Sequence, residues 1–149
     1  MRKKLLVALV LMAIVSVAGS AQERTVVRSA KAKRMLLGRH KLSLQWISWD
    51  YFGTATVTDK KGVLHLVGGQ TGRGSTDFVS IDGIISSVDE KEFEFNGTIV
   101  TQVSHIFGGK PCTRDGELIF KITGKRKYWR LQQMENPCDE AADYVDIYL

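Results

Sequence analysis

The chain has 149 residues, with 21 Lys and Arg against 16 Asp and Glu, and only two cysteines, Cys112 and Cys138. This length allows one domain with a hydrophobic core, but not two. The excess positive charge lies before Leu42; from Leu42 onward, 11 basic residues face 15 acidic ones. A nucleic-acid surface needs a basic stripe interleaved with aromatic residues on the fold itself, and the sequence predicts none.

The first 21 residues have the layout of a secretory signal peptide. Basic residues at positions 2–4 come before an apolar run at 5–17, and small residues follow up to Ala21. The run is shorter than the roughly 20 residues of a membrane-spanning helix, so we expect cleavage after Ala21. The alternative is an uncleaved N-terminal anchor. We expect an exported protein, periplasmic or secreted, without a stable membrane span.

Residues 22–37 form a basic N-terminal linker, which is either flexible or a short helix, and we expect the barrel domain to span 38–149. In this domain, apolar and polar residues alternate in short segments, as in β-strands. The segments are 41–49, 54–58, 62–68, 77–85, 92–103, 117–124, 127–134 and 143–149. They predict an all-β fold, a single antiparallel up-and-down β-barrel of about eight strands. At this size the interior is either filled by side chains or holds one small ligand.

Two of these segments repeat one pattern. The motif of residues 79–85 recurs at 93–99, with Gly83 and Gly97 at equivalent positions. Each segment keeps a single alternation through its glycine, which predicts two long antiparallel strands bent at the glycines, with a turn at 86–92. Two separate tight hairpins at Asp82-Gly83 and Asn96-Gly97 are the alternative.

Cys112 and Cys138 are expected to form a disulfide, because an even cysteine count in an exported protein favours one. A redox or metal pair is the alternative, but there is no C-x-x-C motif and no histidine near either cysteine. The three histidines, His40, His65 and His105, come from separate segments. We therefore expect no metal site.

The glycine-rich run from Gly68 to Ser75 has the glycine spacing of a phosphate-binding loop. Ser75 stands where such a loop carries lysine, and no helix is predicted to follow, so the run is interpreted as a bend between strands. The chain has no G-x-S-x-G elbow. Asp143 and Asp146 would lie on opposite faces of an extended strand, so they do not predict a glycosidase pair. We expect a protein that is not an enzyme and has no cofactor.

The aromatic residues allow two functional hypotheses. In the first, Trp46, Phe95 and Trp129 line a hollow barrel that carries a small apolar or amphipathic ligand, and Arg130 stacks beside Trp129 to close one end. Aromatic residues at alternating positions are, however, more often core.

In the second hypothesis the barrel is filled and works as an envelope protein-interaction or inhibitor module. Its loops at 68–75 and 107–114 would make the contacts, and the basic arm would dock on an anionic envelope surface. In either case we expect a monomer.

The sequence resembles small exported bacterial proteins of unknown function in the segments GRHKLSLQWISWDYFGTATV, GGKPCTRDGELIF, KRKYWRLQQMENPCD and DYVDIYL. At fold level the pattern resembles the calycin or lipocalin-like barrels. The lipocalin G-x-W motif is not met, because Gly38 is followed by Arg39 and His40. The first tryptophan is Trp46. The resemblance implies a barrel-closing role for Arg130.

Overall fold

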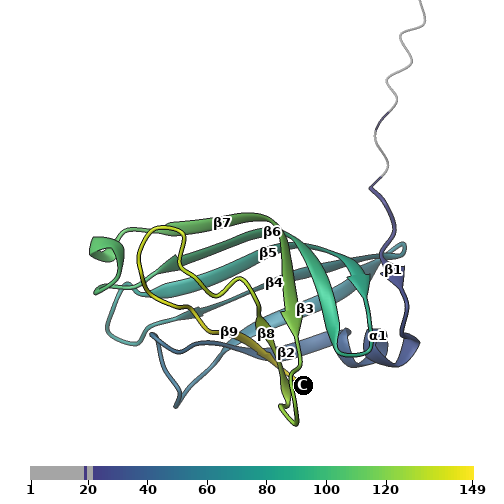
Figure 1. The fold of residues 1–149 in the computed structure, drawn as a ribbon, viewed down its shortest axis with the longest axis horizontal. Coiled ribbons are helices and arrows are strands. Elements are labelled where there is room, and N and C mark those ends of the chain that lie inside the picture. The colour runs from purple at the N-terminus through teal and green to yellow at the C-terminus, as the bar shows by residue number, and fades with distance from the viewer. Residues whose placement is uncertain (1–18, 20–21) are drawn as a thin grey trace, which may run out of the picture.

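Eight antiparallel strands close into one barrel (Figure 1). A two-residue strand at positions 26–27 and one short helix lie at one end of it. The computed structural model describes Gly19 and residues 22–149. The remaining residues of the predicted signal peptide, 1–18 and 20–21, lie outside the described residues. The elements are β1 (Val26–Val27), α1 (Ala30–Leu36), β2 (Gly38–Leu44), β3 (Gly53–Lys60), β4 (Val63–Thr71), β5 (Phe78–Val88), β6 (Glu92–Gln102), the 3₁₀ helix η1 (Phe107–Gly109), β7 (Cys112–Lys121), β8 (Tyr128–Leu131) and β9 (Val145–Tyr148).

Each strand from β2 to β8 pairs antiparallel with the next one along the chain. The last strand, β9, pairs back with β2 through Leu42 and Ile147, which closes the barrel. The predicted up-and-down barrel of about eight strands is therefore confirmed. No helix in the described part of the chain is long and apolar enough to cross a membrane.

The two strands with the repeated motif, β5 and β6, pair along almost their whole length. Gly83 lies opposite Gly97, and Gly97 lies opposite Gly116 of β7. The prediction of two long antiparallel strands is confirmed, and the two-hairpin alternative is wrong. A Cβ atom on Gly97 would lie 2.6 Å from the Gly83 Cα and 2.6 Å from the Phe95 ring. Glycine is needed here because the Phe95 ring occupies the space over both backbones.

The barrel interior is filled by side chains. Phe93 stacks on Phe120 with 5.1 Å between ring centroids, and Trp129 meets the Phe93 ring at 5.8 Å. Phe95 packs edge-on against Phe120 at 6.2 Å. All four rings are at most 2 % exposed. These rings belong to one continuous hydrophobic core that occupies the middle of the barrel.

Residues 22–37, predicted as a linker that is either flexible or a short helix, pack against the barrel as β1 and α1. The Ser29 hydroxyl caps α1 by accepting the Ala32 N–H at 3.1 Å. Ala32 and Leu36 are buried in the core, so this segment belongs to the barrel domain. Lys33 donates to Asp59 of β3 at 2.7 Å, and this hydrogen bond lowers the pKa of the Asp59 carboxyl below its usual value.

The two ends of the barrel differ. At the helix end, α1 lies beside short turns. The turn after β7 is bonded to the turn between β5 and β6, because the Ile122 N–H donates to the Lys91 carbonyl at 2.7 Å. At the other end, here called the loop end, lie the four longer connections. These are 45–52, 72–77, 103–111 and 132–144.

Candidate functional site

Trp46 does not line the barrel interior, so that part of the ligand prediction is wrong. β2 ends at Leu44, and residues 45–50 turn back over the loop end. The Leu44 carbonyl accepts the N–H groups of Ile47 and Ser48 at 3.0 and 3.4 Å, which turns the chain out of β2, and the Ser48 hydroxyl accepts the N–H groups of Asp50 and Tyr51 at 2.9 and 3.3 Å in the bend that follows. The Trp46 side chain is left 37 % exposed. The predicted strand over 41–49 is therefore half strand and half turn.

Phe95 and Trp129 point inward as predicted, but they lie within the packed core. They are 0 % and 2 % exposed, and both contact the Phe93–Phe120 aromatic cluster through ring edges. The structure does not bring them together with Trp46. Ligand contact by these residues stays a prediction.

Arg130 faces the outside of the barrel, because neighbouring residues of a strand alternate between its two faces. Its guanidinium forms two 2.7 Å hydrogen bonds with the buried carboxylate of Asp146. It lies over the rings of Tyr144 at 4.2 Å and Tyr128 at 5.2 Å, not over Trp129 as predicted. The Asp146 hydrogen bond raises the pKa of Arg130, although burial opposes this. Arg130 and Asp146 therefore form a largely buried ion pair on the outer face.

A seam runs between β7 and β8, which pair through only two residue pairs. Beyond Leu131 the chain is no longer a strand of the barrel. Residues 132–144, here called the crossing segment, run along the part of β7 that does not pair with β8. The first of them, Gln132, donates its N–H to the Ile119 carbonyl at 2.8 Å. The predicted disulfide between Cys112 and Cys138 is present and ties the far end of this segment to β7.

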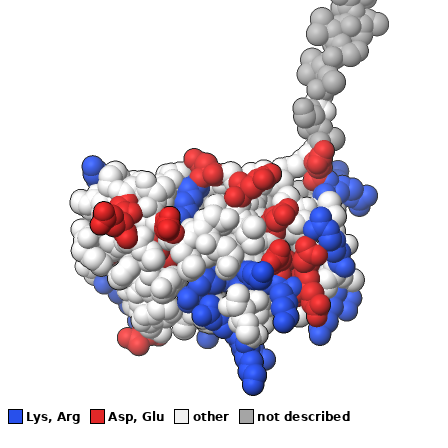
Figure 2. Space-filling view, in the orientation of Figure 1, with Lys and Arg blue, Asp and Glu red and all other residues white. Residues whose placement is uncertain are grey.

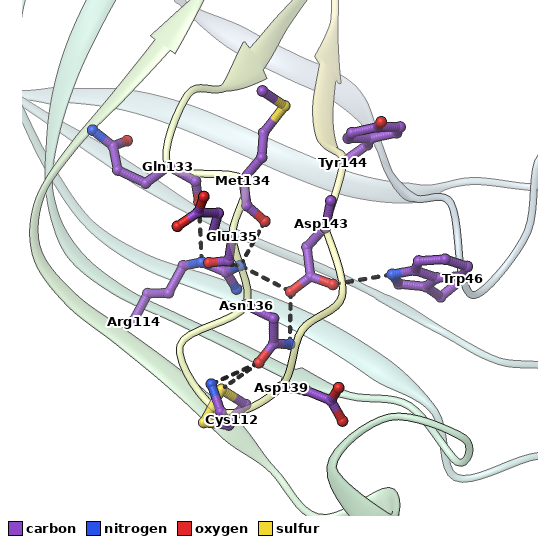
Figure 3. A network of polar contacts seen from close by, with 12 residues as sticks. Trp46, Cys112, Arg114, Gln133, Met134, Glu135, Asn136, Asp139, Asp143 and Tyr144 are labelled. Atoms are coloured by element: carbon purple, nitrogen blue, oxygen red, sulfur yellow. Dashed lines mark hydrogen bonds and ion pairs between the residues drawn. A yellow bond between two sulfur atoms is a disulfide. The ribbon is translucent and has the colours of Figure 1, made fainter.

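A buried ion pair holds the same segment from inside (Figure 3). Arg114 on β7 contacts Asp143 at 2.9 Å, and its side chain is 4 % exposed. The guanidinium also donates to the carbonyls of three residues in the crossing segment, Gln133, Met134 and Glu135.

The Asp143 carboxylate has both oxygens engaged. Besides Arg114, the Trp46 indole N–H donates to it at 3.0 Å and the Asn136 amide donates at 2.9 Å. Asp143 lies ahead of β9 rather than within the strand as predicted, and both it and Asp146 have an arginine of their own. The geometry assigns Asp143 to closing the seam.

The loop end carries exposed aromatic side chains on connections that are tied to one another. Trp49, which is not among the residues predicted to line a ligand site, is 54 % exposed. The Arg73 N–H donates to the Tyr51 hydroxyl at 2.9 Å, which joins the 45–52 and 72–77 connections. Asp77 accepts the N–H of Ser104 at 3.0 Å, which joins 72–77 to 103–111.

The glycine-rich run forms the end of a strand followed by a bend. Gly68 to Thr71 continue β4, and the chain turns over 72–77. The loops predicted to make contacts, 68–75 and 107–114, therefore reach the same end of the barrel.

A second surface lies on the outer face of β8, β9, β2 and the start of β3. We call it the basic face; its residues are Arg39, Lys41, Phe52, Arg126, Lys127, Tyr128, Arg130, Tyr144 and Tyr148. Figure 2 shows basic side chains gathered over β8 and the turn before it, in the lower part of the view. In the sequence, basic residues at alternate positions of the short runs 39–41 and 126–130 indicate that each run has a basic outer side. The two runs become one surface only because β9 pairs with both β2 and β8.

The histidines lie apart, as the sequence suggests. His40 is buried, with its ring nitrogens 2.8 Å from the Tyr148 carbonyl and 2.7 Å from the Leu36 carbonyl. His105 packs edge-on against Trp46 at 5.5 Å. Among the described residues, no three His, Cys, Asp or Glu side chains are grouped as a metal site would require.

The chain has relatives among known proteins. The model of the PM1083 family matches residues 24–149. The protein described as "Uncharacterized protein PM1083" of Pasteurella multocida (strain Pm70) is 47 % identical over 133 residues, which cover 89 % of this chain and 86 % of that protein. No solved structure matches, so kinship with the lipocalins stays a prediction. The matched region runs from just before β1 through β9, and the chain belongs to the PM1083 family.

Proposed function

We propose that this protein binds a protein partner with its loop end and acts by binding, not by catalysis. The observation that carries the proposal is the filled interior. Phe95 and Trp129, the residues expected to line a ligand chamber, are packed against other rings within the barrel. A filled barrel of this kind serves as a scaffold for its surface.

The loop end has the features of a protein-binding surface. Trp46 and Trp49 are exposed, and tryptophan is enriched among the residues that contribute most to protein interfaces. Hydrogen bonds join the connections to one another, and the Trp46 indole is held by its bond to Asp143, so part of this surface is ordered before binding, which reduces the entropy lost on association. The Cys112–Cys138 disulfide supports an exported location, where such bridges persist.

The carrier hypothesis finds less support. Three cavities, of about 460, 530 and 140 Å³, open at the outer surface of the barrel, and none has Phe95 or Trp129 in its wall. A small ligand would have to bind outside the core or displace core side chains. Native mass spectrometry separates the hypotheses, because a carrier purified from its own cells would show an added mass that denaturation releases.

The proposal is tested by placing a photoactivatable amino acid at position 49 in cells that make the protein. We expect a discrete crosslinked product containing one other protein, because Trp49 is the most exposed tryptophan at the loop end. The matched control is the same amino acid at Glu117, an exposed position on the side wall of the barrel. In purified form, Trp49→Ala should weaken binding of the identified partner at least about tenfold.

Equal crosslinking from positions 49 and 117 would contradict a specific loop-end interface. A small-molecule adduct at position 49, together with a releasable mass, would replace the proposal with the carrier hypothesis.

A further inference from the structure

The basic face holds cations that the rest of the chain does not neutralise. Among the residues that the structure describes, Arg39 and Lys41 take part in none of the ion pairs. The carboxylate nearest in the sheet, Asp146, is buried and already bound to Arg130. Free cations on one side of a protein create a local positive potential that attracts anions.

These cations border a shallow hollow on the outer surface of the barrel. The hollow has a volume of about 460 Å³, lies over the paired strands β2 and β3, and is lined by Arg39, Lys41, Phe52 and Thr54, among others. Lys41 and Thr54 are direct neighbours in the strand pairing, so their side chains leave the sheet side by side. The Arg39 guanidinium donates to the Thr54 hydroxyl at 3.4 Å. The hollow thus offers two cations and a hydroxyl to an anionic group.

The aromatic rings of this face hold its cations in place. Lys41 lies 5.1 Å over the Phe52 ring, and Arg126 lies 5.7 Å over the Tyr128 ring. Arg130 covers both Tyr128 and Tyr144. Because cations already occupy these ring faces, a nucleobase could not stack there without displacing them. The face is suited to binding anions and is poorly suited to stacking planar ligands.

We infer that the basic face docks an acidic protein segment, whose Asp and Glu carboxylates enter the hollow beside Arg39 and Lys41. A projecting carboxylate side chain fits a hollow, whereas a membrane presents a flat anionic surface. The most exposed aromatic side chain, Trp49, lies at the loop end, and Phe52 of this face has the Lys41 ammonium over its ring.

The opposite wall favours one orientation of such a partner. Its outward positions on β5, β6 and β7 carry exposed acidic residues, and these are Asp82, Glu94, Asp115 and Glu117. Repulsion from this wall and attraction to the basic face would steer an acidic segment to one side of the barrel. This inference goes beyond the loop-end proposal, and either can fail while the other holds.

The test measures fluorescence anisotropy of a labelled poly-glutamate peptide titrated with the purified protein. We expect binding at low salt that weakens steeply as salt is added. The double variant Arg39→Gln/Lys41→Gln should weaken it about tenfold, since each rim charge contributes modestly. The control Lys61→Gln/Lys91→Gln removes the same charge from exposed turns at the helix end and should leave affinity within about twofold.

Both pairs of positions are exposed, and thermal melting checks that each variant is folded. The single variant Lys41→Glu gives a second reading and should weaken binding at least as much as the double variant, because it places a carboxylate beside the docked one. Equal losses in the two double variants would overturn the inference, because they would show that only net charge matters. Binding to phosphatidylglycerol vesicles without binding to the peptide would also overturn it and assign the face to membranes.

Discussion

At the scale of single residues, Arg114 is a buried charge with several partners on one segment of the chain. It points inward from β7, where a lone guanidinium would carry a large desolvation penalty. Asp143 compensates its charge, and three carbonyls of the crossing segment accept its hydrogen bonds. The pair therefore holds residues 132–144 along β7, in addition to its effect on stability.

Replacing Arg114 with Met alone should lower the free energy of unfolding by about 3–5 kcal/mol, because it leaves Asp143 buried without its counter-charge. The double variant Arg114→Met/Asp143→Leu should recover much of that loss. Denaturant unfolding of the two single variants and the double variant measures the coupling. As a control, Arg28→Met breaks the exposed pair with Asp89 and should change stability by less than about 1 kcal/mol. A loss as small as this in Arg114→Met would contradict the assignment.

Single residues also show how far the sequence reaches. Phe95 and Trp129 could be placed inside the barrel, because alternation alone decides which face of a strand a residue occupies. Trp46 could not, because the alternation continues past Leu44 while the Leu44 carbonyl accepts the N–H groups of Ile47 and Ser48 and turns the chain. Arg130 was assigned to Trp129, its neighbour in the chain, but its actual partner Asp146 lies on the adjacent strand.

At the scale of elements, β5 and β6 depend on their glycines. The repeated motif predicts both strands because each glycine keeps the alternation unbroken. It does not show that the two glycines face one another, which is a matter of register. Their pairing lets the backbones approach beneath the Phe95 ring.

Gly97→Val should destabilise the protein by at least about 1–3 kcal/mol, because the new side chain would overlap Phe95 and the backbone of β5. The matched control is Asn96→Val, which adds a β-branched residue at an exposed position of the same strand. Thermal unfolding followed by circular dichroism compares them. If the two variants melt at the same temperature, the close approach at Gly97 is not needed for folding.

Element ends were harder to predict than elements. The alternating segment 127–134 predicts a strand of eight residues, but β8 ends at Leu131. Beyond it, the carbonyls of Gln133 and Met134 bond the Arg114 side chain in place of a neighbouring strand. A contact between positions so far apart in the chain leaves no local signal, so the sequence pattern runs on where the strand does not.

At the scale of the whole molecule, the barrel is closed by two short strands, β8 and β9. Across the seam, β7 and β8 share two residue pairs, and β9 shares three with β8 and three with β2, whereas β6 and β7 share ten. The disulfide and the Arg114–Asp143 pair lie along this seam and replace the missing strand pairing. Barrel closure therefore depends on side chains where it would ordinarily depend on backbone.

Cys138→Ser should lower stability by about 3–4 kcal/mol under oxidising conditions, from the loop-closure entropy of a bridge spanning 26 residues. A reducing agent should lower the melting temperature of the parent protein toward that of the variant and leave the variant unchanged. An unchanged melting temperature in Cys138→Ser would show that the seam holds without the bridge.

The candidate surfaces were only partly within reach of the sequence. Loops 68–75 and 107–114 were expected to make contacts, and both lie at the loop end. The basic face was missed, because its cations come from the two ends of the barrel domain and meet only across β9. A count of charges along the chain does not reveal a basic surface whose residues are brought together only by strand pairing.

The pairing of β9 with β2 also sets an order of events for a growing chain. Leu42 is made early and its partner Ile147 comes more than a hundred positions later, so the edge of β2 stays without this neighbour for most of synthesis. Until then the barrel cannot close, and a chain that has not yet folded can still be threaded through a translocation pore. For a protein that we propose to be exported, late closure keeps the polypeptide competent for transport until its final strand has been made.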